Sequence, residues 1–251
     1  GTIDSFNSSD PRSITLTSTT SGLVQTDSDI GIIAVLKTFT ANAGASGTVT
    51  IQDVLGDNTV NVKTQTGISI TGNLNLIESD TNLYGGTSDI NISGNITGGP
   101  STNIDFNNSA GSIFVSGVSG IGTSSVPVGN VTVDGTPSAL DIAGSVYAAN
   151  FKTINNVAGQ IRVGGSQVVT NDIRLYADAG PITLGDVKTT NGSIDIAVNG
   201  SGTVTTGALL SGTSLSSGSD ISVRHGSTLT INGNVTGKTF TEVAGSLGNI
   251  V

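Results

Sequence analysis

The most constraining feature of this sequence is a short apolar, polar, apolar triplet that recurs along the chain, often flanked by Gly, Asn, Asp or Ser. Successive side chains of a β-strand point to opposite faces, so such a triplet fits a short strand with one buried face. Turn-forming residues separate the triplets at intervals of about ten positions, a spacing typical of chains with many short strands. Clear triplets occupy residues 14–16, 49–51, 60–62, 68–70, 74–76, 90–92, 104–106, 113–115, 131–133, 140–142, 161–163, 173–175, 182–184, 194–196, 221–223 and 229–231. The pattern predicts an all-β protein.

The residue composition supports strands and limits the kind of core that they can form. There are 25 Ile and 24 Val against 15 Leu, and β-branched side chains favour strands over helices. Aromatic residues make up only 4% of the chain and there is no Trp, Met or Cys, so large side chains cannot fill a thick core. Only 11% of residues are charged, which separates this chain from disordered sequences of similar Gly content. We therefore expect an ordered protein with a thin, repetitive core.

Regular spacing between triplets indicates a solenoid. Triplets begin at Ile161, Ile173, Ile182 and Ile194, so every second one recurs after the same interval of roughly 21 residues, which suits a coil of two or three short strands. Residues 88–98 (SDINISGNITG) and 227–237 (STLTINGNVTG) repeat the same pattern, and a Gly-Asn-aliphatic element recurs at Gly72, Gly94, Gly129, Gly233 and Gly248. Stacked coils bury aliphatic residues that one coil alone would leave in water, and stacked Asn, Ser and Thr can form ladders along the axis. Coils of roughly 20 residues, each adding about 4.8 Å, predict about 12 coils and a rod of about 60 Å.

We predict one elongated domain over residues 1–251. Within it, residues 1–63 are less regular, and residues 117–137, rich in Gly, Ser and Pro, form a looser coil or an insertion. The alternative architecture is a tandem array of β-sandwich domains.

Charge and hydropathy exclude several partners. The net charge of −9 and the pI near 4.2 remove the basic footprint that nucleic-acid binding requires, and they disfavour anionic membranes. The longest apolar run, residues 30–36, is far shorter than the roughly 18 residues of a membrane-spanning helix. Without Cys the chain has no disulfide, no catalytic thiol and no thiolate metal ligand.

The sequence nominates no catalytic, cofactor-binding or metal-binding residue. The single His, His225, is expected at the surface or in a turn, and no adjacent Asp-Asp pair supplies the acid and base groups of a polysaccharide-cleaving β-helix. The Gly-rich residues 117–122 lack the Lys-Ser/Thr ending of a phosphate-binding loop. We therefore expect a protein that is not an enzyme.

Two acidic segments of the sequence are candidate calcium ligands. Asp27-Ser28-Asp29 and Glu78-Ser79-Asp80 each place two carboxylates two residues apart, and carboxylate oxygens are calcium ligands. Neither segment continues into an EF-hand loop, and turn chemistry explains acidic residues at such places without a metal. The expectation is therefore no cofactor, with calcium as the alternative.

The repeats resemble those of large secreted bacterial adhesins of the filamentous-haemagglutinin type. The resemblance is carried by residues 192–212 (GSIDIAVNGSGTVTTGALLSG) and 218–237 (GSDISVRHGSTLTINGNVTG), and it concerns pattern and composition over about residues 88–237. It implies a right-handed β-helix, export to the cell surface, and a role in adhesion or as a shaft that carries an adhesive tip. The secretion domain found at the start of such proteins is not recognisable in this chain.

The expected function is therefore that of a non-enzymatic extracellular protein, either a shaft segment of an adhesin or a subunit of a surface filament. Residues 245–251 (GSLGNIV) stop within the repeat pattern, so we expect continuation into further repeats or self-association with another copy. A host or matrix glycan or protein is a further expected partner. The alternatives are a carbohydrate-active β-helix enzyme and a glycan-binding module, although the nine Phe and Tyr residues are spread from Phe6 to Phe240.

Overall fold

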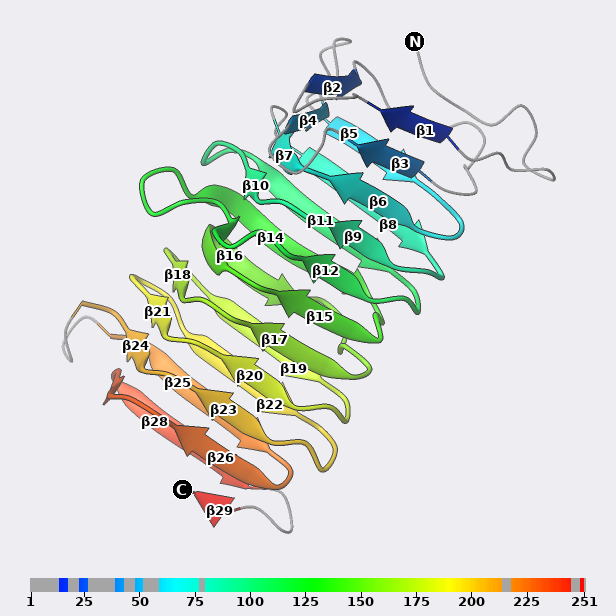
Figure 1. Cartoon of the computed structure of the whole chain (residues 1–251). Helices are drawn as coiled ribbons and strands as arrows, with labels where there is room; N and C mark the ends of the chain where they lie inside the picture. The colour runs from blue at the N-terminus through cyan, green and yellow to red at the C-terminus, as the bar shows by residue number, and fades with distance from the viewer. Residues whose placement is uncertain are drawn as a thin grey trace.

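The protein is a β-solenoid whose strands lie parallel to one another (Figure 1). The computed structural model describes residues 14–17, 23–26, 39–42, 48–51, 59–76, 80–213, 218–244 and 249–250. The regular structure of these residues consists of strands, and none of them belongs to a helix that could cross a membrane. Because β-sandwiches are built from antiparallel strands, the parallel pairing excludes the tandem-sandwich alternative.

Eight consecutive turns of the coil follow one another from Ile68 to Ala244. Each turn contributes one strand to an 11-stranded sheet and then runs twice along an 18-stranded sheet. We refer to these three positions as the first, second and third strands of a turn. In the fourth turn the long strand β16 (Ser145–Thr153) fills both the second and the third positions.

The first strands are β1 (Ile14–Thr17), β3 (Phe39–Asn42), β6 (Ile68–Thr71), β9 (Ile90–Ile92), β12 (Ile113–Val115), β15 (Ala139–Ile142), β17 (Gln160–Val163), β20 (Ile182–Leu184), β23 (Val204–Thr206), β26 (Thr228–Ile231) and β29 (Asn249–Ile250). The second strands are β2 (Leu23–Thr26), β4 (Thr48–Ile51), β7 (Asn73–Leu76), β10 (Ile96–Thr97), β13 (Gly120–Ile121), β18 (Gln167–Val169), β21 (Val187–Thr189), β24 (Leu209–Ser211) and β27 (Val235–Thr236). The third strands, besides β16, are β5 (Thr59–Lys63), β8 (Asp80–Gly86), β11 (Asn103–Asn108), β14 (Val128–Gly135), β19 (Ile173–Ala177), β22 (Ile194–Val198), β25 (Asp220–His225) and β28 (Thr239–Ala244).

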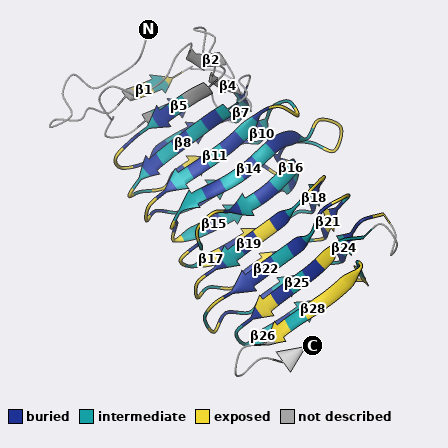
Figure 2. Cartoon of the chain, turned by 180° about the vertical axis from the view of Figure 1, so that it is seen from behind, coloured by how far each residue is buried: buried dark blue, intermediate teal, exposed yellow. Residues whose placement is uncertain are grey.

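The register of the strands stacks aliphatic side chains into ladders that run the length of the coil. The first inward position of the first strands is filled by Ile68, Ile90, Ile113, Leu140, Ile161, Ile182, Val204 and Leu229, each no more than 1% exposed. Along strands such as β6, β8 and β11, buried residues alternate with more exposed ones (Figure 2). The period-2 triplets of the sequence are therefore the inward and outward positions of these strands.

The predicted repeat is confirmed in the region where the sequence is most regular. Ile161 pairs with Ile182, and Ile173 pairs with Ile194, so the triplets that recur at the predicted interval occupy equivalent positions in successive turns. Elsewhere the turns are longer, and the longest of the eight runs from Ile113 to its partner Leu140. The eleven first strands among the described residues thus give a stack of about 48 Å at about 4.8 Å per step. This stack is shorter than the rod predicted from the sequence, because the real coils take up more chain.

The longest of these turns contains residues 117–137, the stretch that we expect to be looser. Strands β13 and β14 lie within it, and the segment that joins them exposes nearly half of Val126. Residues 1–63 are described only as the separate strands β1 to β5, so most of that segment lies outside the described residues.

Glycine allows consecutive turns to approach closely where the first strand bends into the second. A Cβ atom on Gly94 would clash with the carbonyl group of Gly72 in the preceding turn, and one on Gly117 would clash with Asn95. Any side chain there would push the turns apart. The recurring Gly-Asn element marks this corner at Gly72, Gly94 and Gly233, whereas Gly129 lies within the third strand β14 and Gly248 lies outside the described residues.

The Asn side chains at the start of the third strands form a ladder of hydrogen bonds along the axis. Asn103 Nδ2 donates to Asp80 Oδ1 (2.7 Å), and Asn130 Nδ2 donates to Asn103 Oδ1 (2.8 Å). Asn150 Nδ2 then donates to Asn130 Oδ1 (2.7 Å), and Asn150 Oδ1 accepts from the backbone N–H of Asp172 (3.2 Å). The ladder confirms the expectation of stacked polar side chains, and it satisfies polar groups at a corner that the strands leave unpaired.

Replacing Phe106 with Ala is expected to destabilise the coil strongly. Phe106 is a fully buried inward residue of β11, and loss of a buried Phe side chain costs about 3–5 kcal/mol. The matched control is Phe114→Ala on β12, where the side chain faces outward, with an expected cost below about 1.5 kcal/mol. Urea unfolding followed by circular dichroism measures both, and equal losses of stability would contradict the inward assignment of Phe106.

Candidate functional site

Charged and aromatic side chains concentrate on the outward side of the third strands, which we call the third-strand face. Strand register aligns their outward residues into rows that run along the coil. One row contains Asn82, Asp105, Thr132, Lys152, Arg174, Asp195 and Ser222. A second row contains Lys63, Tyr84, Asn107 and Asp134, and further along the coil Tyr176, Ala197 and Arg224. Residues distant in sequence thus become neighbours on this face.

The first group on this face, the Asp105 cluster, consists of Lys63, Tyr84, Asp105 and Asp134. Asp105 lies on β11 between Tyr84 on β8 and Asp134 on β14, and the Lys63 ammonium group lies 4.9 Å from the centre of the Tyr84 ring. Asp105 Oδ1 is buried without a hydrogen-bond partner among the described residues. A carboxylate that has lost water without gaining donors is unfavourable in its charged form.

The electrostatics of the Asp105 cluster follow from this burial. Burial, together with the nearby Asp134 carboxylate, raises the pKa of Asp105 to about 6. Burial, followed by the Asp105 and Asp134 carboxylates, raises the pKa of Tyr84 above its usual range. Asp105 can therefore carry a proton in mildly acidic solution, as a general acid does.

The second carboxylate of the cluster is already engaged. Asp134 Oδ1 accepts from Asn155 Nδ2 (2.8 Å) and from the backbone N–H of Gly135 (2.7 Å), and its Oδ2 accepts from Asn107 Nδ2 (3.3 Å). These bonds give Asp134 a structural role at the end of β14. The cluster thus contains one carboxyl group with a displaced pKa, and its second carboxylate is held by neighbouring amides.

The second group is a hollow of about 340 Å³ between Tyr176 and Arg224, which we call the Tyr176 hollow. Its lining is completed by Asp195, Ala197, Asn199 and Ser222. The Tyr176 hydroxyl donates to Asp195 Oδ2, and burial followed by this bond raises the pKa of Tyr176. This group combines an aromatic ring, a carboxylate and a cation.

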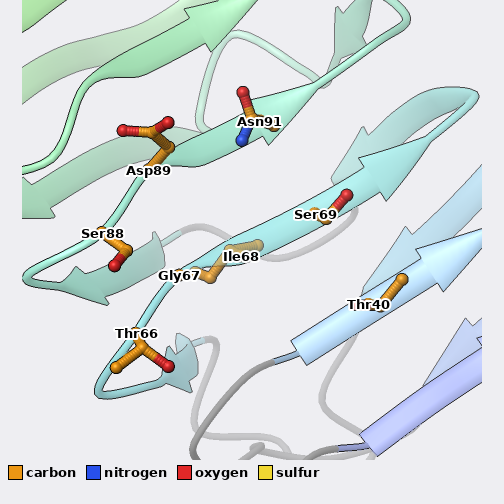
Figure 3. A pocket seen from close by; sticks show the side chains of 8 residues that line it. All are labelled: Thr40, Thr66, Gly67, Ile68, Ser69, Ser88, Asp89 and Asn91. Carbon is orange, nitrogen blue, oxygen red and sulfur yellow. The ribbon is translucent and has the colours of Figure 1, made fainter.

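The third group lines another hollow, of about 260 Å³, on the outward side of the 11-stranded sheet over β3, β6 and β9 (Figure 3). Its lining includes the hydroxyl groups of Thr40, Ser69 and Ser88 and the amide of Asn91. Its one titratable residue, Asp89, accepts the backbone N–H of Ser112 (2.7 Å) and so joins one turn to the next. These residues contain no nucleophile paired with a base, which leaves the third-strand face as the richer surface.

His225 is not at the surface or in a turn, and that expectation is wrong. It is fully buried on β25, where Ile221, Val223 and His225 occupy alternate inward positions. The period-2 pattern of residues 221–225 carried this signal, because an inward Ile and Val predict an inward residue two positions later. His225 Nε2 lies 2.5 Å from Glu242 Oε1 of β28, and Nδ1 has no partner among the described residues.

The two segments considered for calcium are only partly covered by the structure. Asp27, Ser28 and Asp29 lie outside the described residues, and so do Glu78 and Ser79. Asp80 is described, and it receives the Asn103 amide at the start of the Asn ladder. Within the described part of the chain, no three acidic or His side chains gather as metal ligands would.

Comparisons with protein-family models, with curated protein sequences and with solved structures give no match. The fold is that of a β-solenoid repeat protein, and none of these comparisons supports the adhesin type.

Sequence reasoning missed both groups on the third-strand face. Tyr84 and Asp105 lie about one turn of the coil apart, and Tyr176 and Arg224 lie two turns apart, with no local motif around either pair. The signal that could have found them is the register itself, since outward residues one turn apart stand beside each other. Unequal turn lengths hide that register in the linear sequence.

Asp105→Asn is expected to stabilise the protein at pH 7. Because the pKa of Asp105 is raised in the folded state, folded chains bind more protons than unfolded ones between about pH 4 and 6, and stability falls as the pH rises through this window. The variant does not lose stability in this way. Its gain in stability over the wild type should therefore shrink on acidification and vanish below about pH 4. Unfolding midpoints measured against pH for both proteins check this.

Asp172→Asn is the control, because it should change the stability at pH 7 in the opposite direction. The backbone N–H of Ser193 and then Lys152, acting against burial, lower the pKa of Asp172, so its contribution to stability is present at neutral pH and is lost as the pH falls. This variant should be less stable than the wild type at pH 7. The same sign for both variants would refute the electrostatic account.

Removing Glu242 should weaken the last turns of the coil. Glu242→Ala leaves the buried His225 ring without its partner, at an expected cost of about 1–3 kcal/mol. The double variant His225→Leu/Glu242→Leu removes both polar groups and should recover most of that loss. Hydrogen exchange of the amides of β25 measures the effect, and a double variant less stable than Glu242→Ala would argue against an ordinary buried pair.

Proposed function

We propose that this chain is a non-enzymatic structural segment of an extracellular bacterial surface protein, either a stiff shaft within an adhesin or a subunit of a surface filament. The observation that carries the proposal is the parallel pairing that joins every turn of the coil to the next. The inward ladder of aliphatic residues continues over eight turns, and the axial Asn ladder joins the first four of them. Such a stack resists bending because every turn is hydrogen-bonded to the turns before and after it.

The composition of the chain supports an extracellular role. A chain of net charge −9 with no Cys needs no reducing compartment, and its acidic character disfavours nucleic acid as a partner. Together with the repeat pattern, these properties favour a secreted adhesin-type protein.

The last described turn supports continuation or self-association. Val235 and Phe240 stand in register with the buried Leu209 and Ile221 and so face inward, yet they are 40% and 42% exposed. Strand β28 is largely exposed as well (Figure 2). An apolar end with an open strand edge pairs readily with another strand, supplied by further repeats or by a second copy.

Electron microscopy of the purified chain tests the proposal. We expect rods about 5 nm long, from the step of about 4.8 Å per turn, that join end to end as the concentration rises. Compact, roughly spherical particles would overturn the proposal of a shaft. Labelling of intact cells with an antibody against the chain tests the extracellular location, and signal obtained only after lysis would count against it.

The variant Phe240→Asp tests whether the chain is a filament subunit, because only that role requires association through the exposed end of the coil. A carboxylate at this inward position should abolish end-to-end association, which analytical ultracentrifugation measures over a range of concentrations. Val118→Asp, at an exposed position between β12 and β13, is the matched control and should leave association unchanged. A wild-type chain that stays monomeric at every concentration would rule out the filament subunit.

A further inference from the structure

The Tyr176 hollow has the size and the chemical variety of a small-ligand site. Its volume of about 340 Å³ falls within the range of about 300–1,000 Å³ that is typical of such sites. It lies on the third-strand face over β19, β22 and β25, where the coil is most regular. None of its residues faces the core, so the fold does not require the polar side chains that line it.

The hollow exists because a small residue stands between two large ones. Register aligns Tyr176, Ala197 and Arg224 across three adjacent strands. Ala197 points outward but is only 6% exposed, because its taller neighbours stand on both sides. The floor of the hollow is therefore the Cβ atom of Ala197, and its two walls are the Tyr176 ring and the Arg224 side chain.

The Tyr176 ring is held in place before any ligand arrives. Its hydroxyl is bonded to Asp195 Oδ2, and the guanidinium carbon of Arg174 lies 4.6 Å from its ring centre. A ring fixed by two contacts loses little conformational entropy when a ligand packs against it. Aromatic side chains with one polar end provide such a rigid, partly apolar wall.

Arg224 supplies a positive charge that no described residue neutralises. It makes no hydrogen bond or ion pair with any described residue, whereas Arg162 and Lys152 are paired with Asp141 and Asp172. A guanidinium group binds a carboxylate through two parallel hydrogen bonds. The hollow also holds a carboxylate, Asp195, whose Oδ2 accepts the hydrogen bond of the Tyr176 hydroxyl and whose register partner on β19 is Arg174.

The remaining polar groups suit hydroxyl groups. Asp195 can accept a hydrogen bond, and the Ser222 hydroxyl and the Asn199 amide can both donate and accept. We infer that the Tyr176 hollow binds a saccharide that carries a carboxylate, with Arg224 on the carboxylate, Asp195 and Ser222 on hydroxyl groups, and the Tyr176 ring against the apolar face of the sugar. A simple carboxylate would leave the ring and Asp195 unused, and a neutral sugar would leave Arg224 unpaired.

This site would give the proposed surface protein a class of ligand. Its biological relevance rests on the proposed function, but ligand binding itself does not. The two proposals fail in different experiments. Shape and assembly decide the role as a shaft, whereas ligand titration decides the site.

The test is a titration of the full chain at pH 7 with methyl β-D-glucuronide, methyl β-D-glucoside and acetate, followed by NMR. The glucuronide and the glucoside differ only at the carboxylate. We expect the glucuronide to bind and to shift the amide signals of β19, β22 and β25, with the glucoside and acetate at least about 10-fold weaker. Arg224→Ala should weaken glucuronide binding by about 10-fold or more, and Ala197→Leu should abolish it by filling the floor.

Lys188→Ala is the matched control for charge. It removes one cation from an outward position of β21, outside the hollow, and should leave binding unchanged. Circular dichroism establishes that each variant is folded. Equal affinity for glucuronide and glucoside would overturn the carboxylate recognition, and acetate as strong as the glucuronide would overturn the saccharide. Glucuronide binding that survives both Arg224→Ala and Ala197→Leu, or no binding at all to the wild type, would overturn the site.

Discussion

The structure depends on one constraint: each short strand has too few apolar side chains to form a core alone. A strand such as β12 turns only Ile113 and Val115 inward, and both are buried because the same positions of β9 and β15 lie beside them. The inward ladder is thus a property of the stack, and each turn is stabilised by its neighbours. This explains how a chain with few aromatic residues can form an ordered core, and why the last described turn leaves Val235 and Phe240 partly exposed.

Polar residues solve the second problem of the coil, which is to stack the corners as tightly as the strands. At one corner Gly94 lets a turn approach the backbone of Gly72. At another, Asn103, Asn130 and Asn150 donate and accept along the axis, so their amides pair with one another from turn to turn. Where an inward position carries a polar residue, as His225 does, the neighbouring turn supplies a partner in Glu242. Neighbouring turns thus satisfy some of the buried polar groups, whereas His225 Nδ1 and Asp105 Oδ1 have no partner among the described residues.

The outward positions take no part in packing the core or in stacking the corners. The titratable and aromatic groups of the third-strand face lie at these positions. The third-strand face carries Asp105, whose burial beside Asp134 raises its pKa to about 6, and the Tyr176 hollow, where Arg224 has no partner among the described residues. In a solenoid, side chains on one face can change without disturbing the core, because the core uses only the alternate positions. A coil whose outward face is independent of its core suits a protein that presents binding surfaces at a distance from the cell, which is the role that we propose.

The sequence by itself determined the fold class and much of the core. The triplets at residues 161–163, 182–184 and 194–196 predicted strands with inward Ile, Val and Leu, and their regular spacing predicted the stacking, because alternation and repetition are local properties that survive in a linear pattern. Only the tertiary structure decided the register between turns of unequal length. That register determines which residues lie side by side on the outward face. The approach of Tyr84 to Asp105 and of Tyr176 to Arg224 depends on that register, and so does the burial of His225 against Glu242. These contacts join residues one or more turns apart, and loops of unequal length between them leave no fixed spacing to read.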